Sequence, residues 1–298
     1  VSALFGSSYL LTACGRGENQ SGQMPGAASV ADPLHTISIQ LYTFRNQLNE
    51  DIPGTLQRIA DMGYKYVETY DFSEDLSYDE VGQMLKDAGL SVSSMHGEIP
   101  LGEAGEKALR RAEAFGNDKH IWHGWPEDER YQTEEGVKEL AEIYNEASTF
   151  LQSHGLRFGL HNHWWEMRVD ENDTYPFETL VDYIDDEIFF EIDTYWVKTA
   201  GQEPSDIIRK YQNRTEFLHI KDGPARWTED LGEVPHEPMV PVGQGSQDFD
   251  AIVEACGDNP TWMVVELDES AIDVFDAAKQ SFDYLIENKM AKAERTMA

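Results

Sequence analysis

The sequence predicts a single α/β domain folded as a (β/α)8 TIM barrel. Short runs rich in β-branched and aromatic residues alternate with longer amphipathic runs, which is the pattern of strands and crossover helices around a parallel sheet. The alternation occurs eight times within about 260 residues, which matches the usual composition of a closed barrel. No second domain is expected.

The predicted strands share a short length and an apolar or β-branched composition. They are Thr36–Phe44, Lys65–Tyr70, Ser91–His96, His120–His123, Arg157–His163, Ile188–Thr194, Glu216–Lys221 and Trp262–Leu267. Between them, the segments 52–62 and 137–151 place apolar residues three and four positions apart, which predicts helices. A last helix over 273–289 completes the eighth unit.

Glycines support the predicted helix ends. Several precede a predicted strand and suit the left-handed position that closes a helix: Gly63, Gly89, Gly116 and Gly155. The alternative fold is an open doubly wound sheet, but no glycine-rich phosphate loop follows an early strand. We therefore expect a barrel over residues 33–292 and a short tail over 293–298.

The charge balance excludes some partners. The 298 residues include 56 Asp and Glu against 23 Lys and Arg, a formal net charge of −33. Nucleic acids and anionic lipid surfaces are bound through clustered Lys and Arg, and this chain would be repelled by both at long range. The hydrophobic content of 40% excludes a disordered chain. We expect a globular protein with a solvated acidic surface.

The first residues read as a targeting segment. A short apolar run, Leu4–Leu11, ends in Leu11-Thr12-Ala13-Cys14-Gly15, which resembles the lipobox of bacterial lipoproteins with Cys14 as the lipidated residue. Residues 15–32 are rich in Gly, Ser, Gln and Ala, as in a flexible tether. Export to the periplasm or cell surface with a lipid anchor is therefore expected. An ordinary disordered N-terminus of a cytoplasmic protein is the alternative.

Polar side chains recur at the C-terminal ends of the predicted strands, where TIM barrels hold their active sites. They are Glu68, His96, Glu98, His123, His161, Asn162, His163, Glu166, Asp193, His219, Lys221, Asp222, Glu266 and Asp268. One such residue would be an ordinary polar group at the rim. Several converging carboxylates and imidazoles are costly to bury unless they are paired or bind a cation.

Motifs along the chain carry a family resemblance. Segments 190–197, 218–223, 242–249 and 264–268 resemble those of the sugar phosphate isomerase/epimerase family, which belongs with the xylose isomerase-like TIM barrels. The segment 160–166, Leu-His-Asn-His-Trp-Trp-Glu, resembles the fifth-strand motif of one branch of that family. The resemblance extends from Thr36 to Leu285.

The resemblance implies a site for one divalent metal ion. Relatives hold the ion with a fifth-strand Glu, a sixth-strand Asp, a seventh-strand His and an eighth-strand Glu, of which the last three correspond to Asp193, His219 and Glu266. The fifth-strand position has His161 instead, followed by His163 and Glu166, so any of these three is a candidate. We take His161 as the ligand. Two imidazoles with two carboxylates favour Mn, Co, Fe or Zn over Mg or Ca.

The resemblance also implies chemistry on a carbohydrate. A metal-polarised carbonyl makes the adjacent C–H acidic, and Glu266 would remove the proton to give an enediolate, as in an isomerase or epimerase. Relatives commonly use two glutamates, so Glu166, His163 or Lys221 would supply the second proton transfer. Substrate contacts are expected from a further set of strand-end residues: Glu68, His96, His163, Trp196 and Asp222.

Three alternatives remain open at this stage. If one base suffices, the enzyme is a lyase that eliminates a group from a keto sugar or 3-keto-glycoside. A lipid-anchored sugar-binding protein without catalysis is the second, although a pure binder needs no metal site. The DNA-repair endonucleases of the same superfamily are disfavoured by the net charge of −33. A neutral small carbohydrate is the expected partner, contact with a membrane is expected only through the N-terminal lipid, and oligomers are possible.

Overall fold

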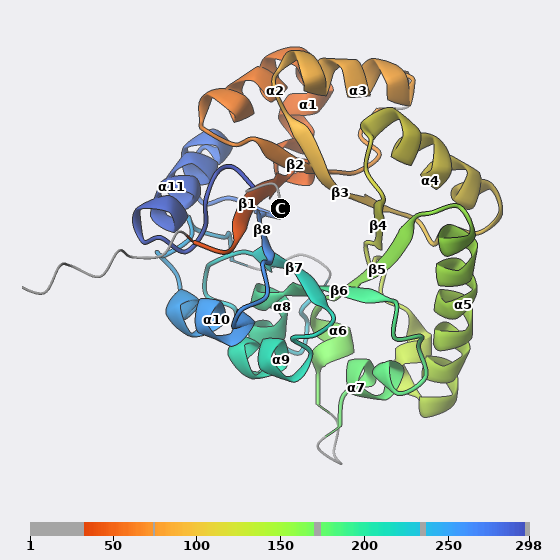
Figure 1. Ribbon diagram of the computed structural model, residues 1–298. Helices are drawn as coiled ribbons and strands as arrows, with labels where there is room; N and C mark the ends of the chain where they lie inside the picture. Colours follow the sequence, from red (N-terminus) through yellow and green to blue (C-terminus); the bar gives the residue numbers. More distant parts are fainter. Residues whose placement is uncertain (1–32, 74, 170–173, 233–236, 296–298) are drawn as a thin grey trace, which may run out of the picture. The chain divides into compact units, whose positions relative to one another are not determined.

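The computed structural model describes residues 33–73, 75–169, 174–232 and 237–295, and residues 32–298 form one compact unit (Figure 1). The predicted lipidation site at Cys14, the tether and the last three residues of the tail lie outside the described residues. No helix in the described part of the chain is both long enough and apolar enough to span a bilayer.

Eight parallel strands close into a barrel in sequence order, each paired with its neighbours and β1 paired with β8 (Figure 1). The strands are β1 Thr36–Gln40, β2 Tyr66–Thr69, β3 Ser91–Gly97, β4 Lys119–Trp122, β5 Arg157–His161, β6 Phe189–Asp193, β7 Thr215–Ile220 and β8 Trp262–Val265. The predicted TIM barrel is confirmed.

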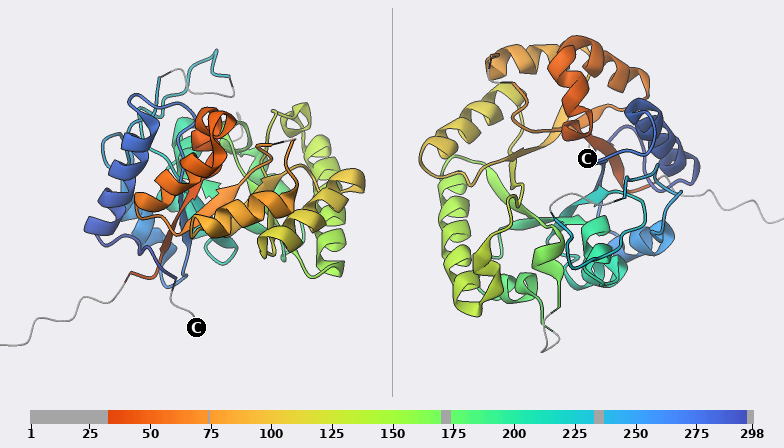
Figure 2. Two further views of the ribbon diagram at one scale, coloured as in Figure 1. Left: turned by 90° about the horizontal axis from the view of Figure 1, so that it is seen from above. Right: turned by 180° about the vertical axis from the view of Figure 1, so that it is seen from behind.

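Helices ring the barrel, and three crossovers are divided into two short helices each (Figure 2). They are α1 Arg45–Glu50, α2 Ile52–Asp61, α3 Tyr78–Asp87, α4 Gly102–Phe115, α5 Glu134–Ser153, α6 Trp164–Met167, α7 Pro176–Val181, α8 Thr194–Thr199, α9 Pro204–Lys210, α10 Phe249–Cys256 and α11 Val274–Glu287. Two 3-10 helices, η1 Leu41–Phe44 and η2 Glu129–Gln132, precede α1 and α5. The prediction of one helix per unit therefore missed the division after β1, β5 and β6.

Local sequence signals explain the helix ends. Ser77 and Glu80 form a reciprocal capping box at the start of α3. Gly116 follows α4 at φ +63°, a left-handed conformation that glycine adopts without a side-chain clash. The other glycines expected to close helices, Gly63, Gly89 and Gly155, also have positive φ. The glycine pattern therefore correctly predicted where helices give way to strands.

The first strand is shorter than predicted. β1 ends at Gln40, whose side-chain oxygen accepts a hydrogen bond of 3.1 Å from the backbone N–H of Tyr42 and so caps η1. Leu41–Phe44 consequently turn into a 3-10 helix instead of extending the strand to Phe44. This early turn brings Tyr42 and Arg45 to the mouth of the barrel.

The barrel interior is divided along its axis. Large apolar residues pack into one cluster that includes Phe189 and Trp262 at the N-terminal ends of β6 and β8; its members are Ile121, Phe189, Phe217, Trp262 and Val264. Because side chains alternate along a strand, Glu191 and Asp193 follow Phe189 on the same face of β6, and His219 follows Phe217 on β7. Ionisable groups therefore sit directly above an apolar floor.

Candidate metal centre and active site

A pocket of about 340 Å³ opens at the C-terminal ends of the strands. That volume suits a small molecule. The described residues that line it come from seven segments around the barrel: Gln40, Tyr42, Arg45, Tyr70, His96, His123, Trp125, His161, His163, Lys221, Glu266 and Asp268. The position agrees with the general rule for TIM barrels.

Three residues on the last three strands converge beside this pocket. His219 Nδ1 lies 2.7 Å from Glu266 Oε2 and 3.8 Å from Asp193 Oδ2. All three side chains are buried, and their ligand atoms lie close enough to hold one metal ion. The structure thus brings together the three ligands that the sequence assigned to the sixth, seventh and eighth strands.

His161 is the fifth-strand residue that faces this group. It lies at the end of β5, and its Nε2 is 3.9 Å from Asp193 Oδ2. Burial is the main reason that the pKa of His161 is lowered to about 4, and the charge of His219 adds to it. The imidazole is therefore neutral at neutral pH and retains a lone pair for a metal.

The donor set fits a divalent transition metal. Asp193 Oδ2 and His219 Nδ1 are buried and make no hydrogen bond, although charged neighbours lie within 4 Å. Buried polar atoms without a hydrogen bond are costly, and coordination to a cation would satisfy both. Two imidazoles and two carboxylates are ligands that zinc, manganese, cobalt and iron accept.

Lys221 brings the only amine among these carboxylates in the described structure. Its Nζ lies 2.7 Å from Glu266, 3.0 Å from Asp193 and 2.9 Å from Asp268. Burial alone would lower the pKa of Lys221, but the three carboxylates outweigh it and hold the pKa well above its ordinary value. Three carboxylates around one ammonium leave an excess of negative charge that favours a further cation.

The predicted active-site residues do not all reach the pocket. Of the residues assigned a role from the sequence, five line it: His96, His161, His163, Lys221 and Glu266. Glu68 is fully buried one layer deeper, where Gln40, Ser94 and His219 donate hydrogen bonds to its carboxylate. The prediction that Glu68 contacts substrate therefore places it too near the surface, because its acceptor sites are occupied by protein groups.

Glu166 is a correction to the predicted acid–base set. It lies in α6 and accepts a hydrogen bond of 2.8 Å from the backbone N–H of His163, as part of a capping box. Burial raises the pKa of Glu166 to about 8. Its side chain is 2% exposed and is not among the described residues that line the pocket. Glu166 thus shapes the turn after β5, and the structure gives it no access to substrate.

Asp222 and Trp196 are also placed outside the pocket lining. The carboxylate of Asp222 accepts hydrogen bonds from backbone N–H groups that include those of Gly243 and Gly245, so it anchors the loop after β7. The ring of Trp196 is 1% exposed, and its backbone N–H donates to Asp193 Oδ1 at 2.9 Å. Neither residue supports the predicted role in substrate binding.

Several pocket residues were not assigned a role from the sequence. Gln40, Tyr42, Arg45 and Tyr70 come from the ends of β1 and β2 and from η1 and α1. The turn after Gln40 was the available signal, but the run up to Phe44 was interpreted as continuous strand. Glu191 was also missed, since it precedes the predicted ligand Asp193 by two residues and appeared to be an ordinary part of the motif.

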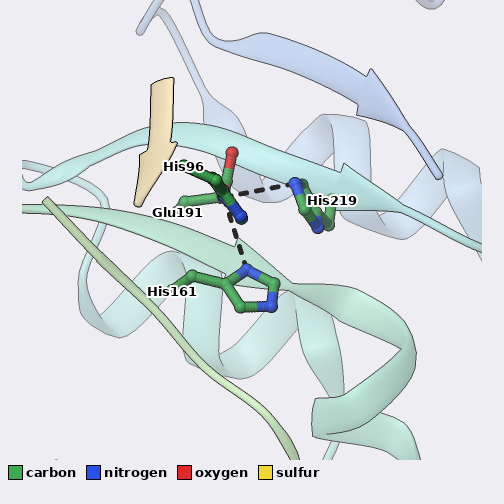
Figure 3. Close-up of side chains that lie close together, drawn as sticks. All are labelled: His96, His161, Glu191 and His219. Atoms are coloured by element: carbon green, nitrogen blue, oxygen red, sulfur yellow. Dashed lines mark hydrogen bonds and ion pairs between the residues drawn. The ribbon is translucent and has the colours of Figure 1, made fainter. Parts of the chain in front are cut away.

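Glu191 lies at the centre of a second group of ionisable residues. The rings of His96, His161 and His219 surround its carboxylate (Figure 3). Its Oε2 is 2.5 Å from His96 Nε2, 3.2 Å from His219 Nε2 and 3.3 Å from His161 Nδ1. Burial would raise the pKa of Glu191, but the neighbouring imidazoles hold it well below its ordinary value.

Residues 56–288 match the family model described as a xylose isomerase-like TIM barrel. The chain belongs to this family. Among curated proteins, it is 26% identical over 181 residues to an inosose dehydratase of Clostridium beijerinckii, a match that covers 57% of this chain and 58% of that protein. The chain thus spans little more than half the length of the curated relatives it matches.

Solved structures of this xylose isomerase-like family share the fold. A sugar phosphate isomerase/epimerase from Parabacteroides distasonis superposes with a TM-score of 0.73 at 24% identity, covering 90% of this chain and 100% of that one. The IolI protein, whose structure has a bound zinc atom, gives a TM-score of 0.62 at 14% identity, with 85% and 99% covered. At these identities, the two structures support the fold alone.

Proposed function

We propose that the chain is a metal-dependent lyase that eliminates a substituent from a keto sugar, a cyclic keto polyol or a 3-keto-glycoside. The observation that carries this proposal is that only one carboxylate of the described metal cluster faces the pocket. Of the carboxylates in the described metal cluster, Glu266 alone also lines the pocket, because Asp193 is fully buried and His161 replaces the fifth-strand Glu. One base suits an elimination, whereas epimerisation through opposite faces requires two.

The metal would be held by His161, Asp193, His219 and Glu266. When bound, it would polarise the substrate carbonyl and neutralise the negative charge that develops on its oxygen. The protein groups supply the remaining chemistry. Glu266 removes the proton from the carbon next to the carbonyl. Burial would raise the pKa of Glu266, but the charges of Lys221 and His219 outweigh it and hold the pKa well below the ordinary value, so the carboxylate is ionised at neutral pH.

Lys221 supplies the acid. Its ammonium lies 2.7 Å from Glu266 Oε2, and both side chains line the pocket. As the C–H electrons form the new double bond, the substituent on the next carbon departs with its bonding electrons and takes a proton from Lys221. A proton then passes from the Glu266 carboxyl to the Lys221 amine, which restores both groups and leaves water or an alcohol as the product.

The pocket suits an uncharged substrate. Arg45 at its mouth donates to the backbone carbonyl of Asp268 at 2.6 Å and pairs with Glu269 at 3.0 Å. Lys221 is neutralised by three carboxylates. Both cations of the described pocket lining are therefore engaged by protein groups, and a phosphate dianion would meet Glu266 and Asp268. A neutral sugar or polyol avoids that repulsion.

Isomerisation is the second candidate, and the contact between Glu266 and Lys221 favours it too. A single base on one face can remove a proton and return it to the neighbouring carbon, with Lys221 protonating the oxygen. The two reactions share the first proton transfer and differ in whether a substituent leaves. The curated relatives are named dehydratases, which supports placing the lyase first.

The proposal is tested by NMR of candidate substrates in deuterated water with Mn²⁺ or Zn²⁺-loaded protein at catalytic concentration. A lyase releases water or an alcohol and gives an unsaturated ketone. An isomerase gives a saturated isomer that carries solvent deuterium next to the carbonyl. Unchanged substrates across neutral keto sugars, keto polyols and keto-glycosides would contradict both activities, and a Glu266→Gln variant is the control.

A lipid anchor at Cys14 is a separate proposal, supported by the sequence alone. Expression in a bacterium fed with an alkyne fatty acid would label the wild-type chain and leave a Cys14→Ala variant unlabelled. Equal labelling of the two chains, or no labelling of either, would contradict the anchor.

A further inference from the structure

Glu191 is the middle residue of three on β6 that share the inward face. It lies between Phe189 in the apolar floor and Asp193 in the metal cluster, and its side chain is fully buried. A buried carboxylate is retained only where it has partners, and the partners here are three imidazoles. Glu191 takes no part in the proton transfers proposed for Glu266 and Lys221.

The two imidazoles of the metal cluster lie between Glu191 and Asp193. His161 directs Nδ1 to Glu191 at 3.3 Å and Nε2 to Asp193 at 3.9 Å. His219 directs Nε2 to Glu191 at 3.2 Å and Nδ1 to Asp193 at 3.8 Å. Each ring therefore has one nitrogen on the metal side and the other on the Glu191 side.

This arrangement decides the tautomers of both rings. A nitrogen that binds a metal offers a lone pair, so the other nitrogen of the neutral ring carries the hydrogen. Those hydrogens lie on His161 Nδ1 and His219 Nε2, which are the nitrogens 3.3 Å and 3.2 Å from Glu191 Oε2. Glu68 shares the task at His219, whose Nε2 lies 2.7 Å from Glu68 Oε1. At His161, the Nδ1 that would carry the hydrogen is buried without a hydrogen-bond partner in the described structure, and Glu191 Oε2 at 3.3 Å is the carboxylate oxygen beside it.

We propose that Glu191 is a positioning residue that orients His161 and His219 and fixes their tautomers for the metal, with His96 as a third donor to the same carboxylate. The inference rests on the proposed metal centre. A carboxylate that accepts from the free N–H of a metal-binding histidine raises the basicity of the ligand, and its loss typically lowers metal affinity about 10–100-fold. Glu191 does so for two ligands at once.

A second metal ion at Glu191 is the competing explanation, since His96, His161, Glu191 and His219 could themselves hold one. That ion would need lone pairs on the inner nitrogens of His161 and His219, so neither neutral ring could also serve the outer cluster. In addition, Glu191 Oε2 lies 2.5 Å from His96 Nε2, which is a hydrogen-bond distance. A single ion bound by Asp193, His219 and Glu266, with Glu191 accepting hydrogen bonds from the imidazoles, accounts for both groups of residues.

The test compares the whole chain with two Glu→Gln variants. Glu191→Gln keeps the shape of the side chain and removes its charge. Glu216→Gln makes the same change at the start of β7, where Glu216 pairs with Arg157 away from the site. Co²⁺ binding is measured by titration calorimetry, and the ligand field is followed by the visible absorption of the bound ion.

The wild type and Glu216→Gln are expected to bind one Co²⁺ with the same affinity and spectrum. Glu191→Gln should bind it roughly 10–100-fold more weakly, with shifted absorption bands because His161 is no longer held in place. Affinity and spectrum unchanged in Glu191→Gln would overturn the inference and leave the metal centre intact. No binding to the wild type would contradict the proposed function itself, and two ions per wild-type chain would favour the second metal site.

A second measurement needs no variant. In ¹⁵N-labelled wild-type protein loaded with Zn²⁺, NMR of the imidazoles should show His161 protonated on Nδ1 and His219 protonated on Nε2. The opposite tautomer at either ring would overturn the role of Glu191, even if Glu191→Gln does not fold.

Discussion

The two halves of the barrel interior are built from the same strands and have opposite chemistry. On β6, β7 and β8, Phe189, Phe217 and Trp262 pack ring against ring. Two and four positions further on the same face of β6 lie Glu191 and Asp193. Packing in the apolar half stabilises the fold. Burying ionisable groups in the other half lowers that stability.

The difference shows why the site is rigid. The metal cluster lies on strands whose lower parts are fixed by aromatic packing, and its imidazoles are held from below by Glu191 and Glu68. Ligands on well-packed strands keep their geometry better than ligands on loops. Substitutions in the apolar half should therefore alter stability, and those in the ionisable half should alter chemistry.

The largest expected effect is on catalysis. Glu266→Gln should lower kcat by about 10²–10⁴-fold, since the amide cannot accept the substrate proton. Its stability should change far less, which a thermal melt measures alongside the rate. Activity within a few-fold of the wild type would remove Glu266 from the role of base.

A substitution in the apolar half should lower stability and leave the metal site nearly unchanged. Phe217→Ala removes a fully buried ring from the floor and should lower the free energy of unfolding by about 3–5 kcal/mol. Metal affinity, measured below the melting temperature, should stay close to that of the wild type. A large loss of metal affinity with little loss of stability would show that the two halves are not separate.

Two buried histidines show the same difference between the two kinds of environment. Burial lowers the pKa of both, and nearby carboxylates reverse the shift in one of them. Glu191, Glu266 and Glu68 outweigh burial at His219 and hold its pKa well above the ordinary value. His120 is buried beside Arg111, and burial lowers its pKa to about 3. An unfolded His120 binds its proton near pH 6.5, so the folded state loses stability as the pH falls from 6.5 toward 3.

Between pH 7 and pH 5, this residue should cost the wild type about 2 kcal/mol of unfolding free energy. A His120→Gln variant should lack that part of the loss, while His154→Gln, at an exposed histidine, should follow the wild type. Urea unfolding at both pH values measures the difference. Parallel losses in all three proteins would mean that His120 does not stay neutral in the folded state.

The smallest effect is expected at the rim. Trp125 lines the pocket and is half exposed. Trp125→Ala should raise KM about 2–10-fold through the lost aromatic contact and leave kcat within twofold. A loss in kcat comparable to that of Glu266→Gln would extend the catalytic machinery to the rim.

The fold was accessible from the sequence because strand and helix runs follow periodic patterns. The family resemblance implied Asp193, His219 and Glu266 as metal ligands, and the structure brings these three side chains together. Side-chain depth was not accessible. Glu68 and Glu166 belong to residue types expected in an active site, but both carboxylate oxygens of Glu68 accept hydrogen bonds from protein groups, and Glu166 is buried outside the described pocket lining. Glu191 is also a carboxylate and lies only two positions before Asp193 on β6. Its greater depth in the barrel can be recognised only in the packed structure.

We propose that one divalent ion is held between Asp193, His219, Glu266 and His161, above the Glu191 cluster. The most direct measurement is X-ray diffraction at the manganese absorption edge from crystals grown with Mn²⁺. One anomalous peak per chain is expected among those four side chains. A peak between His96 and Glu191, or no peak in the barrel at all, would contradict it.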